Sequence, residues 1–391
     1  SAASGDLTLN HLTITGGRTV GNVEGSGGGI SAAYGTVMLN GSTVSGNSTT
    51  GSNANGGGIF SFSSAVTLTG STVSRNTAAN NGGGIASVSG AVTLNSSTVS
   101  GNSTGPGGDG GGILAAYGPV TLTSSTVANN SSGRRGGGVF VFDTGNNPLL
   151  TIQNSIVAGN TAAFEAPDLR PDPGLAIDID FSLIGDTTDS LVSAGLGTGN
   201  VLDVDPLLGP LADNGGPTLT LTHALLVGSP ALDAGAAAVA TDQRGFTRTV
   251  DFATIDNASG SNGSDIGAFE LQPAQASLVV TTVEDLVDNT DPVTSLREAI
   301  SFANSHAGSD TITFAPHVFT GGANSLIRLA SGELQITESL TIDGSSATDV
   351  VISGDKLGND TPVDGTFVTD VDASLAANAG LLDDNSRVIN I

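Results

Sequence analysis

The sequence predicts an all-β protein, a right-handed single-stranded parallel β-helix with one short capping helix. Three glycines followed by Ile or Val occur five times in the first 160 residues, at spacings of 29, 26, 28 and 26 residues. An asparagine recurs in step with them. A period of this length means that one supersecondary unit is stacked many times, and the crossover rule for parallel strands predicts the right-handed winding.

Each repeat contains three short runs in which apolar and polar residues alternate: Gly-Ile-x-Ser, Val-Thr-Leu and Ser-Thr-Val-Ser. Alternation with a period of two turns one set of side chains toward the core and the other toward solvent. The outward positions are mostly Thr and Ser, which suit strands. The inward positions form three expected core columns, namely Ile30, Ile59, Ile85, Ile113 and Val139; Leu39, Leu68, Leu94, Leu122 and Ile152; and Val44, Val73, Val99, Val127 and Val157.

The recurring asparagine marks the turn after the third run. Asn tolerates left-handed backbone, and its side-chain amide can stack on the amide of the next rung. We therefore expect a turn ladder made of Asn47, Asn76, Asn102, Asn130 and Asn160. Aromatic residues make up 4% of the chain and Trp is absent, which suits a narrow core filled by Val, Ile, Leu and Ala.

Four segments are expected along the chain. Residues 1–164 are regular rungs, residues 165–272 an irregular continuation of the β-helix, and residues 273–276 a linker. Residues 277–391 contain a short helix near 295–304 and the first rungs of a next unit. Because a solenoid grows along one axis, its length does not require separate globular domains.

The charge distribution excludes some partners. The net charge is −26, yet residues 1–150 contain four acids and four arginines, so the whole excess lies downstream. Such a chain repels nucleic acid and anionic membranes. Cysteine is absent, which excludes disulfides and thiolate metal sites. A Ser-, Thr- and Asn-rich surface with one lysine predicts an extracellular or cell-surface protein, and the lack of an initiator Met and signal peptide suggests a processed or excised segment.

Three sets of residues resemble known families. Residues 292–304, Pro-Val-Thr-Ser-Leu-Arg-Glu-Ala-Ile-Ser-Phe-Ala-Asn, resemble the CSLREA segment of secreted bacterial β-helix proteins, with Thr294 where that family has Cys. The Gly-Gly-Gly-Ile and Ser-Gly-Asn repeats resemble those of polymorphic outer-membrane proteins. Residues 229–235, 242–246 and 265–270 are similar to the choice-of-anchor Q ending. The resemblance implies a secreted or surface β-helix and transfers no catalytic residue.

The order of these pieces is circularly permuted, because the ending precedes the CSLREA-like beginning. Joining residue 391 to residue 1 restores a strand–turn–strand whose seam residues are Arg387, Val388, Ile389, Ile391, Leu7, Leu9, Leu12 and Ile14. The chain is then one period of a tandem array, or copies dock head to tail through unpaired edges. We expect a structural repeating unit of an extracellular filament, sheath or surface adhesin, with another copy of itself as partner; an open-ended fragment is the alternative.

A polysaccharide-binding or polysaccharide-cleaving β-helix is the alternative function, with surface glycans as partners. Cleavage needs two carboxylates about 5–10 Å apart. Acid pairs occur at Asp178/Asp180, Asp203/Asp205 and Asp383/Asp384, and the first pair alternates on one strand face. A solvated acidic surface is the favoured interpretation, so no catalytic residue is assigned and we do not expect an enzyme. Tyr34 and Tyr117 occupy matching rung positions and could stack on sugars.

Calcium is the one cofactor that the sequence suggests, because hard cations bind clustered carboxylates. The weak candidates are Asp355, Asp360 and Asp364, and a second cluster is Asp285, Asp288 and Asp291. Neither matches an EF-hand loop. The remaining candidates lie in the anchor-Q-like motifs: Asp233, Asp242, Arg244 and Asp265. They could bind a ligand or calcium, but we favour a buried Asp–Arg network that closes the end of the β-helix.

Overall fold

The computed structural model divides the chain into two compact units, residues 1–271 and 272–391, and each is described by itself. The residues whose structure is described are 5–21, 27–143, 149–190, 192, 196–216, 218–252, 255–273, 277–287, 293–305, 309–354 and 389–390.

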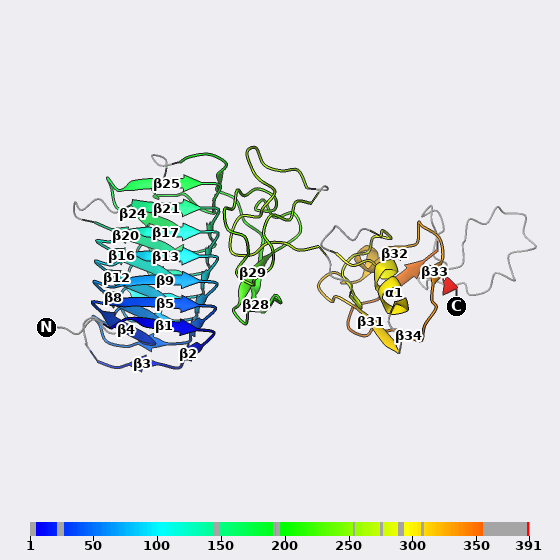
Figure 1. The fold of residues 1–391 in the computed structure, drawn as a ribbon, viewed down its shortest axis with the longest axis horizontal. Helices are drawn as coiled ribbons and strands as arrows, with labels where there is room; N and C mark the ends of the chain where they lie inside the picture. The colour runs from blue at the N-terminus through cyan, green and yellow to red at the C-terminus, as the bar shows by residue number, and fades with distance from the viewer. Residues whose placement is uncertain are drawn as a thin grey trace, which may run out of the picture. The chain divides into compact units, whose positions relative to one another are not determined.

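The first unit is a parallel β-helix, as the repeat predicts (Figure 1). Its strands form four sheets, which we name A, B, C and D in the order in which the chain visits them. Sheet A consists of β1 (Leu7–Asn10), β5 (Thr36–Asn40), β9 (Ala65–Thr69), β13 (Val92–Asn95), β17 (Val120–Thr123), β21 (Leu149–Gln153) and β25 (Ala176–Asp180). Sheet B consists of β2 (Thr13–Thr15), β6 (Thr43–Ser45), β10 (Thr72–Ser74), β14 (Thr98–Ser100), β18 (Thr126–Ala128), β22 (Ile156–Ala158), β26 (Leu183–Ile184) and β27 (Val201–Leu202).

Sheets C and D complete each rung. Sheet C consists of β3 (Arg18–Thr19), β7 (Ser48–Thr49), β11 (Thr77–Ala78), β15 (Ser103–Pro106), β19 (Ser131–Gly133) and β23 (Thr161–Ala162). Sheet D consists of β4 (Ile30–Ala33), β8 (Ile59–Phe62), β12 (Ile85–Val88), β16 (Ile113–Ala116), β20 (Val139–Phe142) and β24 (Leu169–Pro171). A rung therefore has four strands where the sequence predicts three. The sheet C strands are mostly two or three residues long, too short to show an alternating pattern.

The three aliphatic columns lie inside the β-helix. Val73 of β10 is aligned with Val44 of β6 and Val99 of β14, and these side chains are fully buried. Ile30, Ile59, Ile85, Ile113 and Val139 align in sheet D in the same way, as do Leu39, Leu68, Leu94, Leu122 and Ile152 in sheet A. Together they belong to one apolar cluster that runs from Leu9 in the first rung to Val192.

The rungs end with β27, and residues 206–271 do not continue them. This segment, which we name the flank layer, packs along the outer face of sheet B and contains the antiparallel pair β28 (Leu208–Ala212) and β29 (Thr222–Leu225) (Figure 1). The β-helix therefore continues through β24, β25, β26 and β27 and no further among the described residues, where a continuation through residue 272 was expected. The outward residues Ile156 and Leu183 explain the difference, because they are apolar and pack against Leu225, Ile266 and Phe269 of the flank layer.

The second unit also contains parallel strand pairs. Its elements are β30 (Val279–Val280), α1 (Leu296–Asn304), β31 (Asp310–Phe314), the 3₁₀ turn η2 (Gly322–Ser325), β32 (Leu326–Arg328), β33 (Leu334–Gln335), β34 (Leu340–Ile342), β35 (Val351–Ser353) and β36 (Ile389–Asn390). The predicted short helix is confirmed. It starts at a capping box in which Ser295 and Glu298 bond each other's backbone N–H, and it buries Leu296 and Ile300.

No helix in the described part of the chain has the length and apolarity needed to cross a membrane.

Candidate functional sites

The turn asparagines form a continuous buried ladder. The Asn102 side-chain oxygen accepts hydrogen bonds from the backbone N–H of Asn76, at 3.0 Å, and from its side-chain amide, at 2.9 Å. The Asn102 amide in turn donates to the Asn130 side-chain oxygen at 2.9 Å. Asn47, Asn130 and Asn160 repeat this pattern. Each amide thus satisfies backbone groups at a turn that would otherwise be buried without partners.

The ladder ends on an acid that the sequence pattern did not reveal. Asp168 Oδ1 accepts two hydrogen bonds from Asn160, at 2.9 and 2.8 Å, and its Oδ2 accepts one from the backbone of Asp186 at 2.7 Å. Asp168 is buried, and this burial raises its pKa from 3.8 to about 6, although the hydrogen bonds oppose the shift. Asp168 follows Asn160 by eight residues, so it lies outside the repeat spacing that locates the other members.

Asp168 should make the first unit less stable at neutral pH than at pH 4. A carboxyl whose pKa is raised on folding contributes stability below its unfolded pKa, and this contribution is lost as pH rises through the folded pKa. With the pKa moving from 3.8 to about 6, the loss amounts to at most about 3 kcal/mol. Urea unfolding between pH 4 and 7.5 should show it, and Asp168→Asn should flatten this dependence. If the free energy of unfolding changed with pH equally in both proteins, Asp168 would not be the group responsible.

The rung that starts the first unit is open on one side. Within the described residues, β1, β2, β3 and β4 each lie at the edge of their sheet and pair with the second rung alone. The seam residues Leu12 and Leu7 are 52% and 36% exposed, whereas Leu9 is buried and Ile14 half-buried. Of the C-terminal seam residues, Ile389 lies in β36, and Arg387, Val388 and Ile391 lie outside the described residues.

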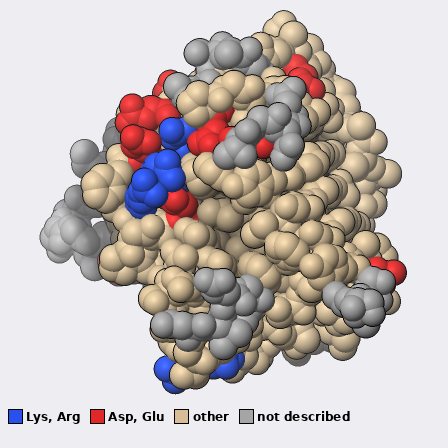
Figure 2. All heavy atoms as spheres, turned by 90° about the vertical axis from the view of Figure 1, so that its left-hand side faces the viewer, with Lys and Arg blue, Asp and Glu red and all other residues tan. Residues whose placement is uncertain are grey.

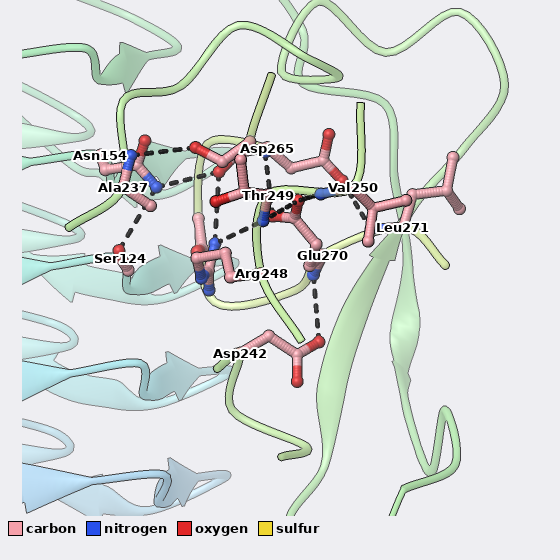
Figure 3. Close-up of polar contacts among 12 residues, drawn as sticks. Ser124, Asn154, Ala237, Asp242, Arg248, Thr249, Val250, Asp265, Glu270 and Leu271 are labelled. Carbon is pink, nitrogen blue, oxygen red and sulfur yellow. Dashed lines mark hydrogen bonds and ion pairs between the residues drawn. The ribbon is translucent and has the colours of Figure 1, made fainter. Parts of the chain in front are cut away.

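Four acids and two arginines form a buried cluster in the flank layer. Figure 3 labels four of them, Asp242, Arg248, Asp265 and Glu270. Arg244 pairs with Asp242 at 2.8 Å, and Arg248 pairs with Glu270 at 3.4 Å. Asp265 accepts hydrogen bonds from the backbone N–H groups of Asp233 and Leu271. Burial raises the pKa of Asp233 to about 6 and that of Glu270 to about 7, and it raises the pKa of Asp265 well above its ordinary value.

This cluster organises the flank layer and does not close the end of the β-helix, where the sequence analysis placed it. The carboxylates accept bonds mainly from backbone N–H groups of irregular loops; Glu270, for example, accepts from Thr249 and Val250 at 2.9 Å. The layer is attached to sheet B by bonds such as that from the Ala268 N–H to the Thr126 hydroxyl at 3.0 Å. The flank layer lies against sheet B because the Thr and Ser hydroxyls on the buried outer face of this sheet need hydrogen-bond partners. Arg248 and Glu270 were missed, although both lie within or beside the quoted motifs.

In the acid pair Asp178/Asp180, the carboxylate of Asp180 binds a turn. Both lie on β25, where Asp180 accepts a hydrogen bond from the backbone N–H of Thr198 at 2.7 Å. Asp203 caps the turn at Thr187, and Asp205 accepts from the N–H of Leu207. These contacts engage the carboxylates of Asp180, Asp203 and Asp205 with nearby backbone N–H groups. Asp383 and Asp384 lie outside the described residues.

Tyr34 and Tyr117 follow sheet D strands at equivalent corners, with φ of 61° and 60°. They are 48% and 37% exposed. Each ring meets a phenylalanine of the next rung edge to face, with centroids 5.6 Å apart for Tyr34 and Phe62 and 5.3 Å apart for Tyr117 and Phe142. The two pairs therefore form exposed aromatic steps on the same side of the solenoid.

The calcium candidates remain untested. Asp355, Asp360, Asp364, Asp288 and Asp291 lie outside the described residues. Asp285 is bound to Arg297 by two hydrogen bonds, at 2.8 and 3.1 Å. Among the described residues, no group of three or more His or acidic side chains is arranged to hold a metal ion.

A charged corner lies between sheets C and D, in rungs whose outward residues are mostly polar and uncharged. Asp109 lies on one rung, Arg134 and Arg135 on the next, and Phe164 and Glu165 on the third. The two arginines, Phe164 and Glu165 line a half-open hollow of about 280 Å³. Figure 2 shows arginine and acidic side chains side by side on a face that is otherwise largely uncharged. The sequence contained a signal for this corner. The residue before the triple glycine is an asparagine in two earlier rungs, Asn55 and Asn81, and a charged residue in the next two, Asp109 and Arg135.

Comparison with known proteins supports the fold. The family model described as "Right handed beta helix region" matches residues 2–167, less than half of the chain. The predicted right-handed β-helix is thereby confirmed. No curated protein and no solved structure matches the chain. A β-helix is consistent with a surface or polysaccharide-related protein.

Proposed function

We propose that this chain is a structural unit of an extracellular or cell-surface assembly that lengthens by end-to-end stacking of β-helices. The first support is the open rung. An edge strand presents unpaired N–H and C=O groups that template pairing with another chain, and here all four first-rung strands are edges. The exposed side chains of Leu7 and Leu12 at this end add apolar surface that a further rung would cover.

The observation that carries the proposal is a sequence match across the seam. Residue 391 followed by residues 1–10 reads Ile-Ser-Ala-Ala-Ser-Gly-Asp-Leu-Thr-Leu-Asn, and residues 30–40 read Ile-Ser-Ala-Ala-Tyr-Gly-Thr-Val-Met-Leu-Asn. The core isoleucines Ile30, Ile59, Ile85 and Ile113 each precede an aligned core residue of sheet A by seven residues. Ile391 precedes Leu7 by the same interval when the ends are joined.

The second unit offers a suitable partner for this rung. Its strand β36, which directly precedes Ile391, pairs in parallel with β33. The segment that leads into the seam thus already belongs to a parallel strand pair. Residues 386–391 of one copy of the chain would then supply the sheet D strand of a rung that continues in residues 1–14 of the next copy. The same holds whether the copies are covalently joined or separate. A heterologous contact that does not close into a ring produces a linear assembly.

Electron microscopy of the 391-residue chain at increasing concentration tests the proposal. We expect unbranched filaments, because each chain has one end that supplies a strand to the shared rung and another end whose open rung receives it. Leu12→Lys should prevent them by placing a charge at the open rung, whereas Leu149→Lys should not, since Leu149 is similarly exposed (43%) but lies on an internal strand of sheet A. Dispersed monomers of the unaltered chain at every concentration would refute end-to-end stacking.

A further inference from the structure

The corner between sheets D and A carries a row of exposed side chains that runs along the axis of the β-helix. Tyr34, Ser63, Ser89 and Tyr117 occupy this corner on four successive rungs, and we name them the corner column. Each donates its backbone N–H to a carbonyl of the next rung, as Tyr34 does to Phe62 at 3.0 Å. The corner column is therefore straight and repeats at the spacing of parallel strands, about 4.8 Å.

The two tyrosines of the corner column have left-handed backbone, with φ of 61° and 60°. A bulky residue with positive φ is an outlier, because its Cβ crowds the following carbonyl oxygen, and such outliers concentrate at functional sites. The fold does not require tyrosine here, since the rungs between them have the small residues Ser63 and Ser89 at the same corner. Packing does not require it either, because both tyrosine side chains are exposed. We infer that the two rings contact something outside the chain.

Each tyrosine ring is held in place by a phenylalanine of the next rung. Phe62 meets Tyr34 edge to face, with an interplanar angle of 83°, and Phe142 meets Tyr117 at 72°. Phe142 also stacks on Phe140, with centroids 6.4 Å apart. Aromatic pairs of this kind stabilise one ring orientation, so a ligand that packs on them loses less side-chain freedom than it would on isolated rings.

The surface around the corner column is uncharged over four rungs. No acidic or basic residue occurs in the sheet D strands, the corner and the sheet A strands of these rungs, residues 30–40, 59–69, 85–95 and 113–123. The adjacent rungs contain one acid each, Asp6, which accepts from the Thr36 N–H at 2.9 Å, and Asp143, which directly follows Phe142. Two acids at the ends of the row would repel an anionic polymer. The matching ligand therefore has apolar faces and hydroxyl groups but no negative charge.

We propose that the corner column binds a neutral, extended β-linked polysaccharide that lies parallel to the axis of the β-helix. The two tyrosine–phenylalanine pairs pack against the apolar C–H faces of separate sugar rings, and Ser63 and Ser89 exchange hydrogen bonds with the sugar hydroxyls between them. Tyr34 and Tyr117 are three rungs apart, about 14 Å, a distance that several linked sugars span. The exposed serines favour a sugar over an apolar protein segment, which would cover their hydroxyls without bonding to them.

Isothermal titration of the full chain with cellohexaose, xylohexaose and mannohexaose tests the proposal, with hexagalacturonate as the charged control. We expect saturable binding of at least one neutral hexasaccharide, and weaker binding of the corresponding disaccharide, which reaches only one of the two aromatic pairs.

Tyr34→Asn and Tyr117→Asn should each weaken this binding by about fivefold, the usual effect of one aromatic contact. Asn tolerates left-handed backbone, so both variants should keep the melting temperature of the unaltered chain. Phe164→Ser is the matched control, because Phe164 is also an exposed aromatic residue but lies at the corner between sheets C and D. This variant should bind the sugar normally.

Four results would overturn the proposal: no saturable binding of any neutral hexasaccharide, equal affinity for hexagalacturonate, unchanged binding by the double variant Tyr34→Asn, Tyr117→Asn, or loss of association between copies of the chain in that double variant without any sugar binding. The last result would make the corner column an interface between copies. Leu12→Lys keeps both tyrosines and should bind the sugar normally, so a failure of end-to-end stacking leaves this proposal unaffected.

Discussion

Replacing Val99 by Asp is expected to unfold the β-helix around its rung. Val99 lies on β14, is fully buried, and is aligned with Val73 and Val127 on the adjacent rungs. An unpaired carboxylate at this position has no partner and no access to water, which should cost on the order of 4–5 kcal/mol or more. That is a large part of the 5–15 kcal/mol by which proteins are typically stable. Far-UV circular dichroism and melting temperature would measure the loss.

A substitution on the same rung provides the control. Thr93 on β13 is half-buried and points outward, next to the inward Leu94. Thr93→Asp should therefore leave the melting temperature nearly unchanged. Val44→Asp on β6 should behave like Val99→Asp, because Val44 is also fully buried. A folded Val99→Asp protein with an unaltered melting temperature would contradict the core column.

Replacing Arg248 by Met is expected to destabilise the flank layer by about 3–5 kcal/mol at pH 8, the usual cost of removing one partner from a buried pair. The side chains of Arg248 and Glu270 are both fully buried, and Arg248 also donates to the carbonyls of Asp265 and Gly267. Since the pKa of Glu270 is raised to about 7, this carboxyl is largely protonated at pH 5, and the loss should be smaller there.

Hydrogen exchange of the amides that Glu270 binds, those of Thr249, Val250 and Asp265, would measure this effect locally. The double variant Arg248→Met, Glu270→Gln should recover part of the stability at pH 8, because it no longer buries an unpaired charge. Equal losses at pH 5 and pH 8 would show that the lost carbonyl contacts, and not the ion pair, account for the effect of Arg248.

The regular rungs were predictable because every rung repeats the same local arrangement of strands and turns. A core isoleucine, an asparagine turn and the intervals between them recur, so the sheet registers follow from the repeat. The flank layer was not predictable in this way. Its position depends on outward residues such as Ile156 and Leu183, which resemble inward ones in a short strand, and on contacts between residues more than 100 positions apart, such as Thr98 with Gln243.

The individual sites likewise divide into those that the repeat predicts and those that it does not. The asparagine ladder follows from the repeat, whereas Asp168 continues it from a loop and has no repeated spacing. The charged corner was overlooked because four acids and four arginines in residues 1–150 cancel in a charge count. Which of these charges meet is decided by rung stacking, which places residues about 26–30 positions apart in the chain within hydrogen-bond distance.

A rearranged chain in which residues 277–391 precede residues 1–271 tests the shared rung most directly. It joins Ile391 to Ser1 covalently and keeps every residue of the seam. Hydrogen exchange should then show strong protection of the amides of residues 388–391 and 7–14, and the protein should no longer form filaments, because the seam is satisfied within one chain. The rung across the seam would be contradicted if the amides of residues 388–391 exchanged rapidly and the rearranged chain had the same assembly state, filament or monomer, as the original chain.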